Sequence, residues 1–489
     1  MSNIDFDNSY ARLPEQFFAR VMPAKPPRPK LIKLNEKLAT QLGLDLSFMQ
    51  SNDGLSILSG EMIPDGADPI AMAYAGHQFG GWSPSLGDGR AILLGEVLDK
   101  NGIRHDIQLK GSGRTPFSRQ GDGRSALGPV IREYIVSEAM YALGVPTTRA
   151  LAAVLSGENV IRNGLETGGV FARVAKSHVR IGTFQYFYAR QDQDAVKTLA
   201  DYVIKRHYPE AEGTQNKYLS LLYAVAERQA KLIAQWMSLG FIHGVMNTDN
   251  MQIAGETIDY GPCAFMDDFH PQKTFSSIDH HGRYSWGNQP KIGQWNLTKF
   301  ADTLVPLIDD DEDTGTKAAT DAIIKYNETV SKVLFRCFSD KLGLLGNDES
   351  QDGIIAATMD AMTMNHVDFT LFYRHLTKIY AGGNEDSLLE LFDDPEAGKE
   401  LLRQWRDHIS VDKADHEQRL KIMQENNPIF IARNHRVAEA IHAGEEGDFK
   451  PFHRLVKVLS KPFDEQPEFA DYENAPKPNE IVHETFCGT

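Results

Sequence analysis

Cysteine is scarce in this chain of 489 residues, which contains only Cys263, Cys337 and Cys487. Three cysteines are too few for a disulfide framework, and no two of them form the C-x-x-C pair that is typical of a structural zinc site. The sequence therefore excludes the small disulfide-stabilised class of protein. A reducing, cytoplasmic location is the simplest expectation.

Long apolar runs and basic charge are also in short supply. No stretch approaches the length of a membrane-spanning helix, and the first residues, MSNIDFDNSYARLPEQFF, are acidic and polar where a secretory signal would be basic and then apolar. The 51 Lys and Arg against 67 Asp and Glu leave a net charge of −16. We therefore expect neither a membrane nor a nucleic-acid partner, and any anionic ligand has to be held by a local basic cluster.

The chain otherwise has an ordinary globular composition, 41% hydrophobic and 24% charged. Its first part combines strand patterns with glycine turns. AYAGHQFGG and LGDGR lead into the apolar strand AILLGEVL, the turn DKNG and the strand HDIQLKG, which carries Lys110. GPVIREYIVSEAMYAL (residues 128–143) then has helical periodicity, and residues 145 to about 187 predict further strands.

Helical patterns dominate the rest of the chain. Apolar residues at spacings of three and four predict a long helix ending at Gly240, and the acidic run 309–313 precedes another helix that continues through residues 325–338. This order predicts an α+β fold of the bilobal protein-kinase type, with a β-rich N-lobe that carries a lysine strand and a helix, and a helical C-lobe.

The predicted fold implies four regions. We expect residues 1–70 to be an N-terminal extension packed on the lobes, residues 71–187 the N-lobe and residues 188–463 the C-lobe. The remaining residues, 464–489, are rich in proline and charge, which predicts an extended, mobile C-terminal tail that ends near Cys487.

The stretch IHGVMNTDNMQIAGETIDYGPC (residues 242–263) resembles the catalytic segment of a kinase without its catalytic base. Kinases have H-R-D-x-x-x-x-N followed by D-F-G. Here His243 and Asn250 stand seven positions apart, and Asp259 begins a D-Y-G sequence, but Val245 occupies the base position. Asn250 and Asp259 supply hard oxygen ligands suited to Mg²⁺. Asp249 is the one nearby carboxylate that can accept a proton, although a turn cap is its alternative role.

Two further groups of residues point to an anionic ligand. Lys110 ends a strand after the glycine loop, where kinase lysines contact phosphates and pair with a glutamate of the next helix, here Glu133 or Glu138. Gly87 and Gly89 would let backbone N–H groups approach a phosphate, although a tight turn needs the same residues. The basic residues are Lys110, Arg114, Arg119 and Arg124 in one loop, with Arg173 and Arg180 further on. Any one of them alone is more typical of a surface ion pair.

These motifs together resemble the selenoprotein O family of protein adenylyltransferases, called YdiU in bacteria. The resemblance covers nearly the whole chain and rests on AYAGHQFGGWSPSLGDGRAILLGE, QLKGSGRTPFSRQGDGRSALGPVIREYIVSEAM, GVPTTRAL, HGVMNTDNMQI, DYGPCAFMD and GRYSWGNQPKIGQWNL. It implies a kinase-like fold that binds ATP in a flipped orientation and transfers AMP to Ser, Thr or Tyr hydroxyls of proteins. Cys487 stands third from the end, where some family members have selenocysteine.

The resemblance also implies a role for individual residues. Asp249 is similar to the proton acceptor of the family, Asn250 and Asp259 to its Mg²⁺ (or Mn²⁺) ligands, and Glu133 to the partner of Lys110. The residues that resemble its nucleotide contacts are Gly87, Gly89, Arg90, Lys110, Asp122, Gly123, Arg173, Arg180 and Asp259. A turned nucleotide explains why valine is tolerated at the base position, because the α-phosphate then faces the metal loop and the arginines hold the leaving pyrophosphate.

Other interpretations stay open. The chain can be a kinase-like phosphotransferase or a non-catalytic pseudokinase that binds nucleotide, and UTP can replace ATP as the donor. We expect a monomer whose partners are ATP and protein substrates with exposed hydroxyls. Cys263 follows the D-Y-G sequence closely and Cys487 ends the tail, so we hypothesise a reversible disulfide between them. The alternative is that all cysteines stay reduced.

Overall fold

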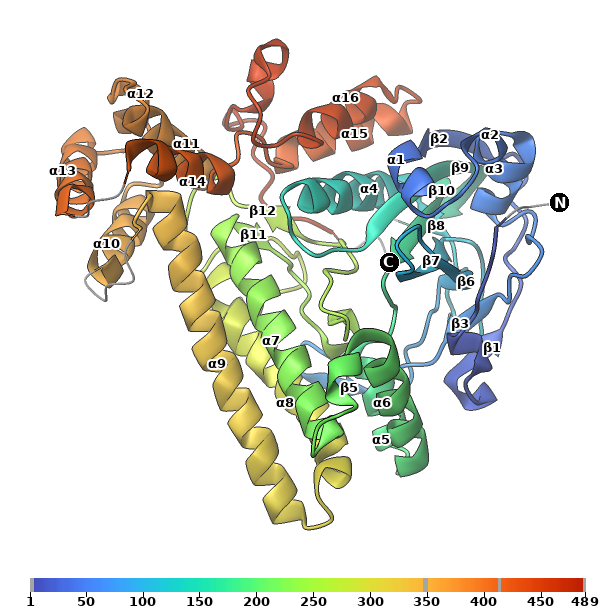
Figure 1. Cartoon of the computed structure of the whole chain (residues 1–489). Coiled ribbons are helices and arrows are strands. Elements are labelled where there is room, and N and C mark those ends of the chain that lie inside the picture. Colours follow the sequence, from blue (N-terminus) through green and yellow to red (C-terminus); the bar gives the residue numbers. More distant parts are fainter. Residues whose placement is uncertain (1–3, 163, 346–350, 412–414, 487–489) are drawn as a thin grey trace.

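The computed structural model describes residues 4–162, 164–345, 351–411 and 415–486. Its central feature is an antiparallel sheet with the strand order β1-β3-β6-β7-β10-β9-β2, to which β8 adds by pairing with β10 (Figure 1). The strands of this sheet are β1 (Phe18–Arg20), β2 (Lys30–Leu34), β3 (Ile70–Met72), β6 (Ala91–Leu98), β7 (Arg104–Lys110), β8 (Ser125–Ala126), β9 (Arg149–Ile161) and β10 (Leu165–Ala175). The predicted strand pair on either side of DKNG is thus confirmed.

Helices cover both faces of the sheet. α1 (Glu36–Gln41), α2 (Leu46–Met49) and α3 (Asn52–Ser59) enclose a compact apolar core on one face. α4 (Leu127–Ala142) packs on the other face, and its buried apolar residues are continuous with the core of the helical region. The described part of residues 1–70 therefore contributes β1, β2, α1, α2 and α3 to this part of the molecule, while the predicted domain boundaries stay predictions.

The remainder of the described chain is mostly helical. Its helices are α5 (Ile181–Tyr188), α6 (Gln193–His207), α7 (Lys217–Ser238), α8 (Gln289–Ile308), α9 (Glu312–Leu342), α10 (Gln351–Met364), α11 (Phe369–Tyr380), α12 (Asp386–Leu389), α13 (Pro395–Val411), α14 (His416–Asn426), α15 (Asn434–Glu445) and α16 (Lys450–Leu459). In Figure 1, α5–α9 lie below and to the left of the sheet, α10–α14 lie at the upper left, and α15 and α16 lie above α4, on which they pack. The observed fold is thus mixed α and β, with one large antiparallel sheet. No helix in the described ranges is long and apolar enough to cross a membrane.

Two predicted long helices are confirmed and their ends have clear causes. α7 is followed by Gly240 in a left-handed conformation (φ +69°), which glycine adopts without steric cost. α9 begins after Asp311, whose side chain accepts the backbone N–H of Thr314 at 2.9 Å, and two more acidic residues stand in its first turn. Acidic side chains at this end favour the helix dipole.

The prediction of strands as far as residue 187 is wrong beyond β10. Residues 181–188 form α5 instead, because Ile181, Phe184 and Phe187 recur at a spacing of three and are all buried. The backbone N–H of Arg180 donates to Thr183 Oγ1 at 3.1 Å at the start of the helix. Aromatic β-formers hid this helical spacing in the sequence.

The expectation of an extended tail that wanders over the surface is wrong at two places in the described part of the tail. Residues Pro467–Tyr472 form a short 3₁₀ helix, and Glu473 accepts Arg374 Nε at 3.1 Å. Further on, Thr485 is buried: its N–H donates to the carbonyl of Phe275 at 2.7 Å and its hydroxyl to the carbonyl of Pro262 at 2.6 Å. The tail is therefore docked against the segment that follows the D-Y-G sequence.

Candidate active site

Strand alternation turns three polar side chains of the sheet toward the face that α4 covers. In β7, Ile107 and Leu109 belong to the core under α1–α3, so Gln108 and Lys110 point to the opposite face. In β10, Arg173 lies opposite Gln108 in the register and donates to its Oε1 at 2.6 and 3.2 Å. Two buried cations are thereby fixed side by side on neighbouring strands.

Glu133 of α4 joins these two cations. Lys110 Nζ donates to Glu133 Oε2 at 2.6 Å, and Arg173 Nη1 donates to Glu133 Oε1 at 3.0 Å. Glu138, the other candidate partner on α4, accepts both Nε and Nη2 of Arg149 at 2.8 Å. Of the two glutamates that the sequence offered, Glu133 is the one that contacts Lys110.

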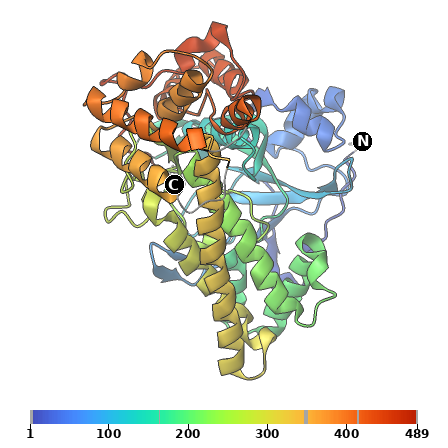
Figure 2. The ribbon, with the colours of Figure 1, turned by 60° about the vertical axis from the view of Figure 1, so that its left-hand side comes forward.

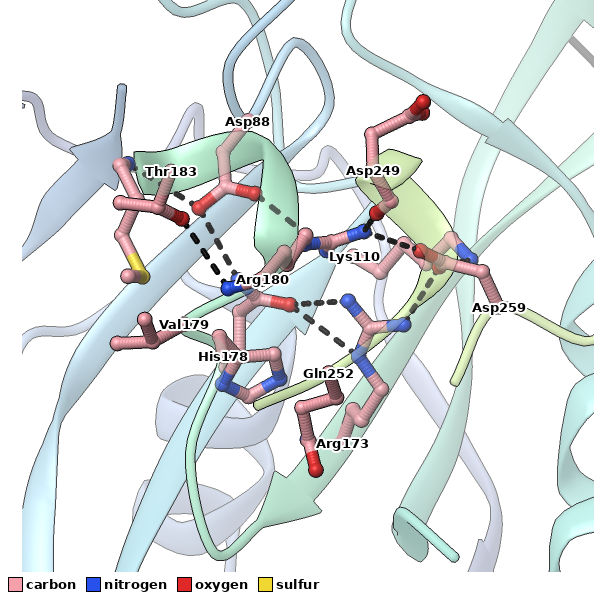
Figure 3. Close-up of polar contacts among 12 residues, drawn as sticks. Asp88, Lys110, Arg173, His178, Val179, Arg180, Thr183, Asp249, Gln252 and Asp259 are labelled. Atoms are coloured by element: carbon pink, nitrogen blue, oxygen red, sulfur yellow. Dashed lines mark hydrogen bonds and ion pairs between the residues drawn. The ribbon is translucent and has the colours of Figure 1, made fainter. Parts of the chain in front are cut away.

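Asp259 is the centre of the candidate site (Figure 3). Its Oδ1 accepts Lys110 at 2.9 Å and Arg173 at 2.7 Å, and its Oδ2 accepts Arg180 at 2.6 Å. Burial opposes ionisation, but these three cations hold the pKa of the Asp259 carboxyl well below its ordinary value. Its backbone has φ +62°, a left-handed conformation that is uncommon outside glycine and that aims the carboxylate at the cations.

Arg180 links the sheet side of the site to the loop that carries Asp249. It is buried, and its Nη1 also donates to the backbone carbonyl of Asp249 at 2.7 Å. Its guanidinium lies over the ring of Tyr74 at 4.7 Å and 3.9 Å from Asp88 Oδ1. Figure 3 shows this guanidinium among Asp88, Asp249 and Asp259, so one side chain positions three carboxyl-bearing residues.

The carboxyl group of Asp249 is buried but incompletely hydrogen-bonded. Its Oδ2 accepts Gln78 Nε2 at 3.1 Å, while its Oδ1 has no hydrogen-bond partner within the described residues. Burial raises the pKa of Asp249 to about 6, against the opposing effect of Arg180. A Cβ at Gly76 would stand 2.6 Å from Asp249 Oδ1, so only glycine at this position leaves room beside the carboxyl. A carboxylate with a vacant lone pair and a pKa close to neutrality is suited to accept a proton.

The loop around Asp249 is built on buried hydrogen bonds. His243 Nε2 is 2.9 Å from the carbonyl of Ile258, and the N–H of Val245 donates to His243 Nδ1 at 3.4 Å, so this neutral histidine ties the two halves of the site together. Asn250 Nδ2 donates to the carbonyl of Val245 at 2.9 Å. That bond fixes the amide plane of Asn250 and leaves its Oδ1 as the acceptor, as a metal ligand requires.

The glycine loop has a structural reason for each glycine. Gly87 has φ +66°, and a Cβ there would stand 2.2 Å from the ring of Phe117. A Cβ at Gly89 would lie 3.0 Å from the carbonyl of Phe117. Residues 87–90 thus run closely beneath the basic loop, and Arg90 is partly exposed where the two meet. The structure brings these two segments together, as a shared ligand would need.

Asp122 and Gly123 lie in the basic loop, at its exposed side. Asp122 accepts both terminal nitrogens of Arg162 at 2.9 and 3.0 Å, which lowers its carboxyl pKa. Gly123 has φ +68°, and a Cβ there would stand 2.1 Å from the carbonyl of Gly113. Both residues have clear roles in holding the loop, and no hydrogen bond between the described residues links either of them to Asp259.

Sequence reasoning missed three polar residues of the site, of which Asp88 and Gln108 are buried and Gln78 is partly buried. Asp88 accepts the N–H of Met72 at 3.1 Å and Gln108 Nε2 at 3.2 Å, and burial raises its pKa to about 6. Gln108 joins Asp88 to Arg173, and Gln78 orients Asp249. Asp88 stood between two glycines that were themselves predicted, which was a usable signal. The two glutamines had none, because only the register reveals their direction.

The donor set for a metal ion is small. No group of three or more His, Cys, Asp or Glu side chains within the described ranges could hold one. Asn250 and Asp259 are the predicted oxygen donors. Arg180 Nη1 donates both to the carbonyl of Asp249, the residue before Asn250, and to Asp259 Oδ2, so the two donor segments lie close together. Two protein oxygens fit Mg²⁺, which usually completes its shell with water and phosphate.

One of the two predicted redox cysteines can be described. Cys263 is buried directly after Pro262, to whose carbonyl the tail residue Thr485 donates. Cys487 lies outside the described residues. The structure therefore places Thr485 of the tail beside the segment that contains Cys263.

Comparison with known proteins identifies the family. A family model described as "Protein adenylyltransferase SelO" matches residues 1–460. The chain is 55% identical over 485 residues to the "Protein nucleotidyltransferase YdiU" of Rhodopseudomonas palustris (strain BisB18), covering 99% of both chains. It is 55% identical over 487 residues to that of Rhizobium etli and 53% identical over 485 residues to that of Bradyrhizobium diazoefficiens, covering 99% of this chain and 97% and 99% of theirs. The chain therefore belongs to the SelO family of protein adenylyltransferases, a class of nucleotidyltransferase enzymes, as its motifs predicted.

Proposed function

We propose that this chain transfers AMP from ATP to Ser, Thr or Tyr hydroxyls of proteins, with the nucleotide in a flipped orientation. The hydroxyl oxygen attacks the α-phosphorus, the bond from the α-phosphorus to the oxygen that bridges it to the β-phosphate breaks, pyrophosphate leaves, and the hydroxyl proton goes to Asp249. The observation that carries the proposal is the pairing of Val245 at the kinase base position with a buried Asp249 whose Oδ1 lacks a partner among the described residues.

Asp249 is suited to its role by its surroundings. Its carboxyl is held on one oxygen by Gln78, while the other oxygen is buried and has no partner among the described residues, so a hydroxyl that reaches Oδ1 finds an unused acceptor. General-base assistance of this kind contributes roughly 10²- to 10⁴-fold in rate. Val245 cannot take over, because its side chain has no acceptor.

The cations suit the leaving group. Lys110, Arg173 and Arg180 converge on the one carboxylate of Asp259, so phosphate oxygens that replace part of these contacts meet preorganised donors. Arg173 and Arg180 are assigned to the outer phosphates. Gly87, Gly89 and Arg90, with Asp122 and Gly123 of the loop above, are assigned to the nucleotide, because their segments pack on each other.

Asn250 and Asp259 would hold Mg²⁺ or Mn²⁺. The ion supplies neutralisation of the phosphate charge when it is bound. Asp259 is already ionised in its cationic surroundings, so it needs no proton loss to serve as a ligand. ATP is the proposed donor, with UTP as an alternative.

The arrangement also supports the bilobal kinase-like interpretation. A lysine strand, a glutamate on the next helix and an acidic D-Y-G residue form one ion-paired cluster between a sheet and a helical body, as in a kinase. We propose that residues 71–187 form the N-lobe and residues 188–463 the C-lobe. We also propose that the protein acts as a monomer in a reducing compartment.

The redox pair is a secondary proposal. The docking of Thr485 on Pro262 supports a Cys263–Cys487 disulfide, because it brings the tail close to Cys263. Peptide mapping without reductant after mild oxidation tests the pair, with Cys487→Ser as the control. Absence of the crosslinked peptide would end the proposal.

Doubly labelled ATP tests the main proposal. With Mg²⁺, label from the α-phosphate is expected on the acceptor protein or on the chain itself, and label from the γ-phosphate is expected in released pyrophosphate. Asp249→Asn, which keeps the size of the side chain, should bind ATP but transfer little. Protein-bound γ-label without α-label would favour the kinase alternative, and nucleotide binding without either label would favour the pseudokinase.

A further inference from the structure

A small hairpin lies directly on the loop of Asp249. β4 (Gly76–Gln78) and β5 (Gly81–Ser83) pair with each other outside the main sheet, and β4 packs on α5 and on the short 3₁₀ helix Thr248–Asn250. The N–H of His77 donates to Thr248 Oγ1 at 2.7 Å. Figure 1 labels β5 within the helical body, below the labelled strands of the main sheet, and Figure 2 shows the same body turned by 60°.

The hairpin turn is held rigidly against the same loop. Phe79 and Gly80 are its two turn residues and both have positive φ, 51° and 83°, as a tight two-residue hairpin demands. Phe79 is not glycine, so its conformation costs free energy that contacts with its neighbours have to offset. Its N–H donates to Asn247 Oδ1 and to the hydroxyl of Tyr284, each at 3.1 Å.

This rigid turn exposes aromatic surface beside the candidate catalytic carboxyl. Phe79 is 36% exposed and Trp82 is 41% exposed, whereas Gln78, directly before Phe79, reaches Asp249. The ring of Trp82 is 4.8 Å from that of His77, which in turn packs at 5.2 Å on Trp295 of α8. Rigid exposed aromatics are typical anchors for a protein partner.

Two guanidiniums flank the hairpin. A Cβ at Gly80 would meet the guanidinium of Arg283 at 3.7–3.8 Å, and Arg283 lies 4.8 Å over the ring of Trp295. On the other side, Arg190 donates to the carbonyl of Pro84 at 3.2 Å, just after β5. Among the described residues, neither arginine forms an ion pair with a carboxylate, although the protein carries a net charge of −16.

We infer that the β4–β5 hairpin, with Arg190 and Arg283 on its flanks, docks the hydroxyl-bearing segment of the protein substrate, and that this segment is acidic with an apolar side chain near the hydroxyl. The inference rests on the proposed function. An acceptor hydroxyl has to reach Asp249, whose carboxyl contacts Gln78 of this hairpin, so the segment on either side of the hydroxyl passes over the exposed aromatics. Carboxylates of the segment pair with the two unpaired guanidiniums.

Binding of matched peptides tests the surface without requiring turnover. The probes are two short synthetic peptides with the same central Leu-Tyr, one flanked by Asp and Glu and the other by Lys, titrated against the full chain by calorimetry. The acidic peptide is expected to bind roughly tenfold more tightly or better. Arg190→Glu with Arg283→Glu should reverse this preference, and Trp82→Ala should weaken the acidic peptide without reversing it.

Arg454→Glu is the matched control, because Arg454 is exposed and forms no ion pair among the described residues, and because its helix, α16, lies far from β5 in Figure 1. It should keep the preference. Retained ATP affinity shows that each variant is folded. If the double charge-reversal variant loses that affinity, Arg283→Gln takes its place, and a reduced preference for the acidic peptide is then expected. Equal affinities, no binding of the acidic peptide, or a preference that survives charge reversal would overturn the inference.

Transfer of α-label to the same peptides distinguishes a failure of the docking surface from a failure of the proposed function. Binding with the expected preference but no transfer to any acceptor leaves the docking surface standing and refutes the proposed function. Transfer that is indifferent to the flanking charge refutes the docking surface and leaves the proposed function standing.

Discussion

Replacing Asp259 by Asn removes the one carboxylate on which Lys110, Arg173 and Arg180 converge. The three donors lie at 2.9, 2.7 and 2.6 Å, and the side chain of Asp259 is 21% exposed, so solvent replaces little of what is lost. Hydrogen bonds to charged groups contribute about 1.5–3 kcal/mol each, and breaking a buried ion pair costs about 3–5 kcal/mol. Because the three contacts share one partner and are not additive, we expect Asp259→Asn to lower the free energy of unfolding by about 3–5 kcal/mol.

Although Asp259→Asn is expected to lower stability, it is expected to raise the affinity for anions. In the parent protein Asp259 competes with phosphate oxygens for the three cations. In Asp259→Asn, Lys110 and Arg173 are left with Glu133, and Arg180 is left with Asp88 at 3.9 Å. Metal-free pyrophosphate should therefore bind the variant more tightly and restore part of its stability. Transfer of α-label, which needs the metal ligand, should be abolished.

Urea unfolding with and without pyrophosphate, in the presence of a chelator, measures both effects. Asp201→Asn is the control: Asp201 pairs with Lys197 at 2.7 Å and Lys217 at 2.9 Å on the surface, and we expect it to cost about 1 kcal/mol or less with no change in the pyrophosphate effect. A loss below about 1 kcal/mol in Asp259→Asn, or pyrophosphate stabilising parent and variant equally, would refute the reasoning about the cation cluster.

Three further predictions concern separate parts of the chain. Asp249→Asn should lower transfer by roughly 10²- to 10⁴-fold while ATP affinity, measured by calorimetry, changes little; an equal loss of ATP binding would reassign Asp249 to the metal. Arg180→Ala should weaken ATP far more than AMP in the same titration, because Arg180 is assigned to the outer phosphates, and equal losses would make it structural. Lys341 is buried at 3.1 Å from the carbonyl of Asn426 and 4.4 Å from the ring of Tyr373, and burial lowers its pKa to about 7. Between pH 7 and the ordinary lysine pKa of 10.5, Lys341 is protonated in the unfolded chain and largely neutral in the folded chain. The free energy of unfolding therefore rises with pH across this window, by at most about 1.4 kcal/mol per pH unit relative to Lys341→Met. Parallel pH profiles of urea unfolding for the two proteins would contradict this.

Motifs and periodicity predicted the parts of this protein whose signal is local. The lysine strand, the following helix and the long helix that ends at Gly240 are each specified by residues within one segment, and all three are present. The choice between Glu133 and Glu138 was open in the sequence, because both lie on the helix. It is settled by Arg149, which engages Glu138 from the neighbouring strand β9.

The features that sequence reasoning missed depend on contacts between distant segments. Gln108 becomes part of the site through the pairing of β7 with β10 and its hydrogen bond to Asp88 of the glycine loop, which no local pattern around Gln108 encodes. α5 was mistaken for strand because its aromatic residues favour strands when their neighbours are ignored. The tail looked free because the partner of Thr485, Pro262, lies more than two hundred residues earlier.

The chemical group left on the acceptor is the most direct test of the central claim. After incubation of the full chain with ATP and Mg²⁺, intact-mass measurement of the modified chain or peptide distinguishes an added adenylyl group from an added phosphoryl group, and the released product is pyrophosphate in the first case and ADP in the second. The flipped orientation predicts an adenylyl adduct that disappears in Asp249→Asn. A phosphoryl adduct, with ADP as the product, would contradict it.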